Sequence, residues 1–171
     1  MEQIGKKHPD ADAQMINIAQ KFETFQQEGF AVLSIDCKKK EPVGNYAYSG
    51  TDICKDPIVV KDHDFKEDDT IVVAPYGVFD IVLNIDFVNL GTSKHTPEFA
   101  VNSIKNWWYK VGTEHYRNVN GLFVTCDGGG SNSYRSHRFK MLLQDLANEI
   151  GLKIVISHYP LGKSKYNKIE H

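Results

Sequence analysis

Residues 31–37 read Ala-Val-Leu-Ser-Ile-Asp-Cys, a short and mainly apolar segment that ends in an acidic residue and a cysteine. A continuous run of this kind is typical of a strand that is buried on both faces. We therefore predict a strand near the centre of a sheet, with Asp36 close to its end. Any chemistry carried by Asp36 would then lie at one edge of that sheet.

The chain before this strand has the pattern of an amphipathic helix between residues 10 and 28. Asp10 can cap its start and Gly29 can end it. We assign residues 1–30 to an N-terminal helix and linker, and residues 31–171 to a core. Apolar side chains recur at helical spacing and form one stripe, made of Met15, Ile18, Ala19, Phe22 and Phe25.

A long irregular segment follows the first strand. Residues 42–74 are rich in Gly, Asp, Lys and Pro, which predicts a surface insertion. Aromatic and β-branched residues then dominate 76–83 and 87–90, so we predict a strand pair that turns around residues 84–86. Together with the first strand, these segments form a three-stranded meander.

Helix and strand patterns alternate in the second half of the chain. Thr96-Pro97-Glu98 has the N-cap, first-position proline and first-turn acid of a helix start, and the helix continues to Gly112 with Trp107 and Trp108 as core anchors. A strand is predicted at 122–127, a helix that ends at Gly151 follows it, and a strand is predicted at 153–157. A further helix begins after Asn167.

Three strands, a helix, a strand, a helix and a strand form the order of the ribonuclease H-like fold. We therefore predict an α/β protein of the retroviral-integrase type, with a mixed five-stranded sheet flanked by helices. In this fold the first and fourth strands are neighbours at the sheet centre. Asp36 and Asp127 could then meet although they are 91 positions apart in the sequence.

Composition sets limits on the function. The chain has 171 residues, 41% of them hydrophobic and 25% charged, which is enough for one substantial core. Its formal charge of −2 gives no overall attraction to nucleic acid, so DNA contacts would need local clusters such as Lys38, Lys39 and Lys40. The sequence has no signal peptide or long apolar span, so we expect a cytoplasmic protein without a membrane partner.

Three cysteines occur without a Cys-x-x-Cys pair. We interpret Cys37, Cys54 and Cys126 as reduced thiols rather than zinc ligands. Strand alternation would point Cys37 and Cys126 away from the side that the neighbouring aspartates face. Their expected role is packing.

Three acidic residues are candidate ligands for a divalent cation. Asp36 and Asp127 end strands, and Glu170 lies 43 positions after Asp127 at the start of the last predicted helix. Carboxylate oxygens suit Mg²⁺ or Mn²⁺, and two such ions can activate the attacking oxygen and stabilise the leaving oxygen of a phosphodiester. The alternatives are ordinary strand-end acids and, with Asn167 as N-cap, a capping box closed by Glu170.

A glycine-rich loop follows Asp127. Gly128, Gly129 and Gly130 would let backbone N–H groups approach a phosphate, and Ser131 and Asn132 extend this loop. Ser131, Asn132 and Ser133 can also cap the following helix. The loop lacks the Gly-Lys-Ser/Thr ending of a nucleotide P-loop, and a flexible turn is the alternative.

Basic residues flank this loop and the third acid. Arg135, His137, Arg138 and Lys140 crowd a helix start, where the helix dipole disfavours cations. DNA phosphate and local acids are equally good candidates for the compensating anion. Near the end of the chain, Lys163, Lys165 and Lys168 form either a DNA-binding loop or a solvated one.

Motifs along nearly the whole chain resemble the DDE transposases of bacterial insertion sequences, specifically the Rhodopirellula-type DDE transposase domain. The resemblance is carried by His8-Pro-Asp-Ala-Asp12, Ser34-Ile-Asp-Cys-Lys-Lys-Lys-Glu-Pro-Val-Gly-Asn45, Pro75-Tyr-Gly-Val-Phe-Asp80, Glu98-Phe-Ala100, Trp107-Trp108, Asp127-Gly-Gly-Gly-Ser-Asn132, Tyr134-Arg-Ser136, His158-Tyr-Pro160, Ser164-Lys165 and Asn167-Lys-Ile-Glu-His171.

The resemblance implies a metal-dependent polynucleotidyl transferase that cleaves DNA at transposon ends and transfers the strands to target DNA. Asp36, Asp127 and Glu170 would be the catalytic metal ligands, with Mg²⁺ or Mn²⁺ as cofactor. Transposon ends and target DNA would be the partners, a homo-oligomer would form in the synaptic complex, and the protein would associate with the bacterial nucleoid.

Members of the group continue beyond the glutamate, whereas this chain ends at His171. We therefore expect a core that is truncated after the third acid, with a mobile Glu170 because one helical turn is poorly stable. The alternatives are a non-catalytic remnant that binds DNA weakly, another ribonuclease H-like nuclease, and a phosphate- or nucleotide-binding module at residues 128–133.

Overall fold

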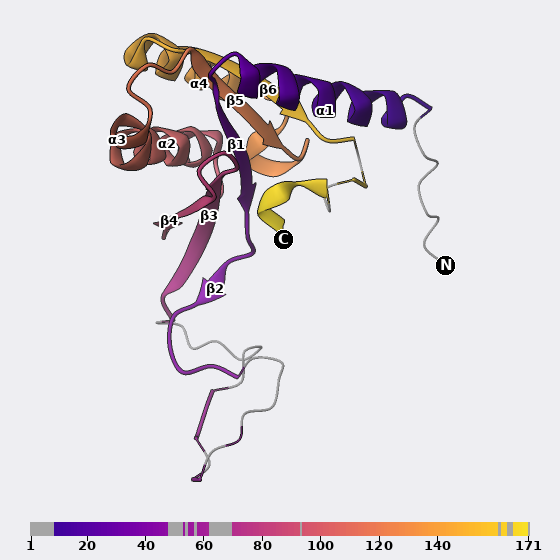
Figure 1. Ribbon diagram of the computed structural model, residues 1–171. Helices are drawn as coiled ribbons and strands as arrows, with labels where there is room; N and C mark the ends of the chain where they lie inside the picture. The colour runs from indigo at the N-terminus through magenta and orange to yellow at the C-terminus, as the bar shows by residue number, and fades with distance from the viewer. Residues whose placement is uncertain are drawn as a thin grey trace.

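The computed structural model shows a mixed sheet with helices packed on both faces (Figure 1). Of Glu170 it describes the backbone alone. The residues that the structure describes are 9–47, 53, 55–56, 58–61, 70–92, 94–160, 162–163 and 166–170.

The sheet is built around the strand at residues 31–37, which is β1 (Ala31–Cys37). β3 (Val72–Asp80) pairs with it antiparallel, and β4 (Ile85–Gly91) pairs antiparallel with β3. On the other side, β5 (Gly121–Cys126) is parallel to β1, and β6 (Lys153–His158) is parallel to β5. Two residues, β2 (Glu41–Pro42), add a short pairing at the start of β3.

The strand order β4-β3-β1-β5-β6, with β1, β3 and β4 antiparallel and β5 and β6 parallel to β1, is the ribonuclease H-like topology. The five predicted strands and the fold are confirmed. Because β1 is central, its first five residues are fully or almost fully buried, as a run without polar alternation predicts.

Alternate residues of β1 enter two separate cores. Leu33 and Ile35 join the larger core, which is closed by α2 (Pro97–Trp107) and α4 (His137–Ile150). Val32 faces the opposite side, where aromatic residues of α1 (Ala11–Gln27) cover the sheet. Asp36 follows the alternation of Val32, so it lies on the α1 side of the sheet.

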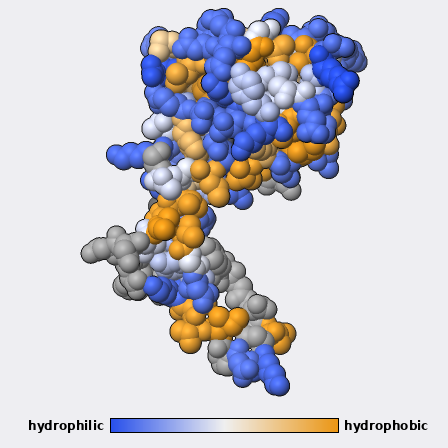
Figure 2. All heavy atoms as spheres, turned by 90° about the vertical axis from the view of Figure 1, so that its left-hand side faces the viewer, coloured by the Kyte–Doolittle hydropathy of each residue, from blue (hydrophilic) through white to orange (hydrophobic). Residues whose placement is uncertain are grey.

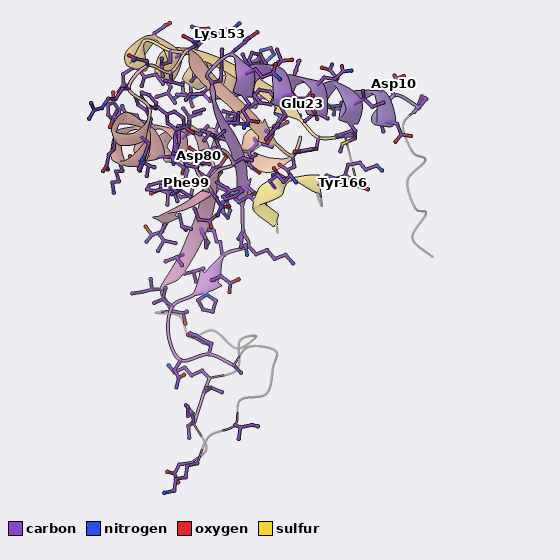
Figure 3. The ribbon with its side chains drawn as sticks, viewed as in Figure 1. Asp10, Glu23, Asp80, Phe99, Lys153 and Tyr166 are labelled. Atoms are coloured by element: carbon purple, nitrogen blue, oxygen red, sulfur yellow. The ribbon has the colours of Figure 1, made fainter. Side chains whose placement is uncertain are left out.

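The strand predicted at 76–83 is displaced, since β3 runs from residue 72 to residue 80. Asp80 lies inside the body of the protein (Figure 3) and its carboxylate accepts hydrogen bonds from the backbone N–H groups of Val82 and Leu83, both at 3.0 Å. These bonds close the turn and end the strand three residues early. Tyr116 also donates its hydroxyl to the Asp80 carboxylate, at 2.9 Å.

The predicted insertion at 42–74 is shorter than expected, because β2 includes Pro42 and β3 already starts at Val72. The described residues of this segment project away from the sheet, and exposed hydrophobic side chains lie among polar ones there (Figures 1 and 2). Ile53 and Val59, for example, are 96% and 90% exposed.

The helix predicted from Thr96 is confirmed, and the Thr96 hydroxyl accepts from the N–H of Phe99 at 3.3 Å. α2 continues through a π-helical turn, η1 (Trp108–Gly112), into the short α3 (Thr113–His115). A Cβ at Gly112 would lie 2.4 Å from Trp108, so glycine allows this close approach. Trp107 and Trp108 are buried, as predicted.

Two predicted helix caps are wrong. α1 occupies the predicted residues and ends before Gly29, which has a φ of 74°, but the Asp10 side chain makes no capping hydrogen bond. α4 is capped by Ser136, whose hydroxyl accepts from the N–H of Phe139 at 3.2 Å, and not by residues 131–133. Within the described part of the chain, no helix is long and apolar enough to cross a membrane.

Candidate active site

Asp36 and Asp127 lie at the same end of two neighbouring parallel strands. The last registered pair of β1 and β5 is Ser34 with Thr125, and Asp36 and Asp127 each follow that pair by two residues, Asp36 within β1 and Asp127 directly after β5. Residues two apart in a strand face the same side, so both carboxylates continue the face of Ser34 and Thr125. The predicted meeting of these strand ends therefore has a basis in the sheet register.

The charges of Asp36 and Asp127 both influence the thiols of Cys37 and Cys126. Burial, followed by the charges of Asp36 and Asp127, raises the pKa of the Cys37 thiol. Burial and the same two carboxylates raise the pKa of Cys126 well above its ordinary value. Both acids therefore act on one small region at the ends of β1 and β5.

Cys37 and Cys126 are free thiols that belong to the larger core, on the side away from the carboxylates. Their predicted packing role is confirmed. Cys54 lies outside the described residues.

The C-terminal segment is bound to β1 beside Asp36. Asn167 is fully buried, and its side-chain amide donates to the carbonyl of Ile35 at 3.0 Å while its oxygen accepts from the Ser34 hydroxyl. The N–H of Ile169 donates to the same hydroxyl at 3.0 Å. These bonds hold the 3-10 turn η4 (Lys168–Glu170) against Ser34. Ser34 lies two residues before Asp36 and on the same face of β1.

This arrangement changes the predicted role of Asn167. Its side chain bonds to β1, across 132 positions of sequence, rather than capping the turn that follows it. The backbone of η4 is held by strand contacts and does not depend on helix nucleation alone. The side chain of Glu170 is not among the described ones, so its place at the site stays a prediction.

Ile169 packs over β3, the strand that pairs with β1 next to Asp36. Gly77 is the β3 partner of Asp36, and a Cβ added there would lie 2.5 Å from Ile169 Cδ1. A groove of about 530 Å³ borders this contact and is lined in part by Asp36, Lys38 and Ile169. The glycine therefore lets the last turn of the chain approach the sheet next to the carboxylates.

The donors present fit a hard divalent cation. Asp36 and Asp127 offer carboxylate oxygens, which Mg²⁺ and Mn²⁺ prefer, and the charges of both act, after burial, to raise the pKa of the same two thiols. Among the described side chains, no group of three His, Cys, Asp or Glu residues is arranged to hold a metal. The third predicted ligand is Glu170, for which the backbone alone is described.

The glycine loop turns its last side chains inward. Asn132 is fully buried, its side-chain oxygen accepts from the Tyr76 hydroxyl at 2.5 Å, and its backbone carbonyl lies 2.8 Å from Nε2 of His158. Ser131 is also buried. The approach of a phosphate to the backbone at Gly128, Gly129 and Gly130 stays a prediction.

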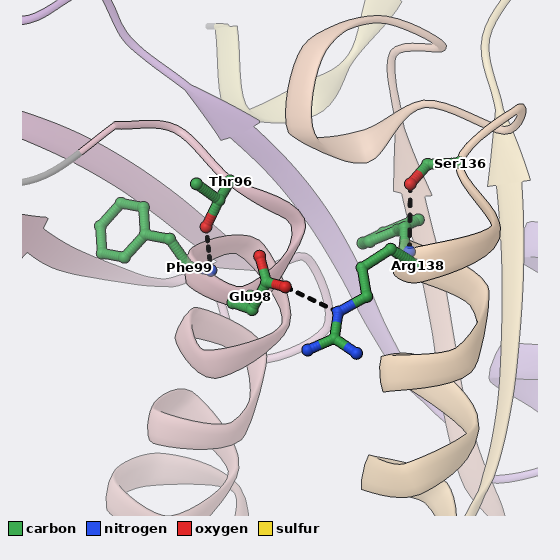
Figure 4. Close-up of polar contacts among 6 residues, drawn as sticks. Thr96, Glu98, Phe99, Ser136 and Arg138 are labelled. Atoms are coloured by element: carbon green, nitrogen blue, oxygen red, sulfur yellow. Dashed lines mark hydrogen bonds and ion pairs between the residues drawn. The ribbon is translucent and has the colours of Figure 1, made fainter.

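Arg138 at the start of α4 pairs with a local acid. Its Nε donates to Glu98 at the start of α2, at 2.7 Å, and this bond lowers the pKa of Glu98 (Figure 4). For Arg138 the compensating anion is therefore a carboxylate of the protein. Arg135 differs, because its guanidinium lies 5.4 Å from the centre of the Tyr134 ring.

The predicted DNA-binding lysines that the structure describes lie around the same end of the sheet. Lys38, Lys39 and Lys40 are exposed directly after β1, and Lys168 is exposed in η4. Lys163 lies with its ammonium 5.3 Å from the ring centre of Tyr166. Lys165 falls outside the described residues.

Sequence reasoning gave Asn167 only the role of an N-cap, and it did not identify Ser34, Gly77 or Tyr134 as contributors to this region. The first three act through contacts between segments that are far apart in the sequence. The one local signal for Tyr134 was an aromatic residue directly before Arg135 in a polar loop.

Comparison with solved structures gives distant similarities. A pre-cleavage Mos1 transpososome matches with a TM-score of 0.49 and 8% identity over 98% of this chain and 51% of that chain. The Mos1 mariner paired end complex with Mn gives 0.48 and 9% over 98% and 50%. The intasome of simian T-cell lymphotropic virus in complex with the PP2A regulatory subunit B56 gamma gives 0.44 and 12% over 81% and 37%.

The chain thus spans about half of the Mos1 chains and a smaller share of the viral one. No curated protein matches the sequence significantly. The family model described as the Rhodopirellula transposase DDE domain matches residues 2–171. With this match across the whole chain, the protein belongs to the Rhodopirellula transposase DDE domain family.

Proposed function

We propose that this chain is the catalytic core of a DDE transposase, which cleaves DNA strands at transposon ends and transfers them to target DNA. The observation that carries the proposal is the register of β1 and β5, whose last pair, Ser34 with Thr125, lies two residues before Asp36 and Asp127 along the two segments. Family membership supports the same activity.

Asp36, Asp127 and Glu170 would hold Mg²⁺ or Mn²⁺. A divalent cation bound there supplies positive charge that stabilises the attacking and leaving oxygens of a phosphodiester. The contribution of the chain is to present carboxylate oxygens from two rigid strands and one docked turn. Asn167 and Ser34 are positioning residues, because they hold the backbone before Glu170 against β1.

Around this centre, backbone N–H groups and basic side chains would bind the phosphates of the DNA. Backbone N–H groups at Gly128, Gly129 and Gly130 can approach a phosphate without side-chain obstruction. Lys38 on one side and Arg135 on the other would contact the strand, with Lys39, Lys40, Lys163, Lys165 and Lys168 adding positive charge. Transposition also requires that two ends be held together, which suggests a homo-oligomer at the bacterial nucleoid.

The test is cleavage of duplex DNA that carries the flanks of the chain's own gene, with and without Mg²⁺. We expect metal-dependent nicks in the wild type and a loss of about 100-fold or more in Asp36→Asn and in Asp127→Asn. Asp145→Asn, which changes an exposed aspartate on α4, is the control. Equal cleavage by all four proteins would refute the proposal.

An RNA–DNA hybrid of the same sequence separates this reaction from that of a ribonuclease H-like nuclease. We expect DNA duplex to be cut and joined to a second duplex. Cleavage of the hybrid's RNA strand without strand joining would assign the protein to the nuclease class instead.

A further inference from the structure

Tyr134 is an aromatic residue that stays exposed beside the candidate active site. It lies in the turn between the glycine loop and Ser136, the cap of α4. Its exposed fraction is 42%, whereas the neighbouring Ser131 and Asn132 are buried. A large ring left accessible in a loop of small polar residues is available to a ligand.

The ring is held in place by two contacts. His158 at the end of β6 meets it edge to face, with the ring centres 5.9 Å apart and an interplanar angle of 66°. A Cβ at Gly128 would lie 3.2 Å from the ring, so the backbone there is in close contact with it. His158 is itself fixed by the carbonyl of Asn132.

These contacts place Tyr134 next to Asp127. Gly128 directly follows Asp127 in the chain, and His158 pairs in register with Cys126, which directly precedes it. Burial lowers the pKa of His158, and the charge of Asp127 acts in the opposite direction, so it reaches the imidazole.

The surroundings of the ring are cationic on one side. Arg135 lies with its guanidinium carbon 5.4 Å from the Tyr134 ring centre. The charge of Lys140 is close enough to lower the pKa of His158, although burial has the larger effect in that direction. Arg135 therefore supplies the cation beside the ring.

We propose that Tyr134 and Arg135 form a stacking platform for a nucleobase of the DNA strand that lies in the candidate active site. Aromatic rings with adjacent arginines bind unstacked bases, because every base offers a flat face, and the guanidinium can pair with the phosphate. The inference rests on the proposed function, since it assigns the strand's position next to Asp127. In an intact duplex the bases are stacked on each other, so the platform favours single-stranded or frayed ends.

The experiment measures binding of a short single-stranded oligonucleotide that carries 2-aminopurine, in EDTA so that no cleavage takes place. The full chain is compared with Tyr134→Ala and Tyr134→Phe. We expect Tyr134→Ala to bind about tenfold more weakly, the low end of the effect of one base–aromatic stack, and to lose the quenching of 2-aminopurine fluorescence. Tyr134→Phe keeps the ring and should retain both.

Tyr109→Ala is the matched control. Tyr109 is 49% exposed and donates its hydroxyl to Glu149, near the opposite end of α4. Thermal unfolding verifies that each variant is folded. Wild-type affinity and quenching in Tyr134→Ala, or an equal loss in Tyr109→Ala, would overturn the inference.

The outcome is separable from that of the proposed function. If the wild type cleaves DNA but Tyr134→Ala binds and quenches like the wild type, the platform is wrong and the transposase activity stands. If the wild type does not cleave but quenching depends on Tyr134, the platform stands and the proposed activity is wrong.

Discussion

Asn167 donates its side-chain amide to the carbonyl oxygen of Ile35 at 3.0 Å, which joins the last described turn of the chain to the central strand one residue before Asp36. Both groups are fully buried. A bond of this kind contributes stability and also fixes where the backbone of Glu170 runs. Its removal should therefore affect folding and metal binding together.

Asn167→Ala leaves the Ile35 carbonyl and the Ser34 hydroxyl without the Asn167 side chain as a partner. We expect the free energy of unfolding to fall by about 1–3 kcal/mol, the usual cost of an unsatisfied buried polar group. Urea denaturation measures this loss. Asn148→Ala removes an exposed amide on α4, bonded to Gln144, and should change the stability much less. Equal effects of the two variants would contradict the docking role of Asn167.

Gly77→Ala tests the close approach of η4 to the sheet. The new Cβ would lie 2.5 Å from Ile169 Cδ1, so the Ile169 side chain has to move, and we expect the turn that carries Glu170 to shift with it. We expect weaker Mn²⁺ binding by calorimetry, with a smaller effect on stability because the obstructed atom is the end of a flexible side chain. Ile169→Ala should restore binding in the double variant. Additive losses in the double variant would rule out this contact as the cause.

The central part of the fold could be predicted from sequence because its signals are local. The apolar run 31–37 and the Thr96-Pro97-Glu98 helix start are each complete within a few residues, and both agree with the structure. The end of β3 was misplaced because the buried Asp80 carboxylate binds the backbone N–H groups of Val82 and Leu83 and so ends the strand. The hydrophobic pattern of the sequence does not show that one acidic residue is buried. The cap of α4 was misplaced because four serine and asparagine residues compete within six positions.

The site divides in the same way. Asp36 and Asp127 could be proposed because each ends a recognisable strand. Asn167 matched the local pattern of an N-cap, and its actual partner on β1 lies 132 positions away, so a long-range contact outweighed the local preference. Gly77 gave no signal, since its importance depends on Ile169 from the opposite end of the chain.

Asp80 and Tyr116 predict a dependence of stability on pH. Burial raises the pKa of Asp80, and the Tyr116 hydroxyl acts in the opposite direction by stabilising the ionised carboxylate. Since the folded pKa is raised, the stability contributed by the protonated form is present at low pH and is lost as pH rises through that pKa. Tyr116→Phe removes a bond that favours the ionised form, so it should cost more near pH 7 than near pH 4.

Denaturant unfolding of Tyr116→Phe at the two pH values measures this difference. We expect a loss of about 1–3 kcal/mol near pH 7 and a smaller loss near pH 4. Tyr109→Phe is the control, because the hydroxyl of Tyr109 bonds to an exposed carboxylate, that of Glu149. The same loss at both pH values would show that ionised Asp80 is not what Tyr116 stabilises.

Divalent cations should stabilise the folded chain through the paired aspartates. A ligand that binds the folded state alone raises the free energy of unfolding by about 2.7 kcal/mol at 100 times its dissociation constant. Thermal unfolding with and without Mn²⁺ should therefore show a rise for the wild type and for Asp145→Asn, and none for Asp36→Asn or Asp127→Asn. Glu170→Ala tests the third ligand independently. A smaller Mn²⁺-induced rise in thermal stability means that the docked turn presents its carboxylate to the cation. An unchanged rise means that Asp36 and Asp127 bind the cation without Glu170. A full rise in both aspartate variants would remove the basis for a cation site at the ends of β1 and β5.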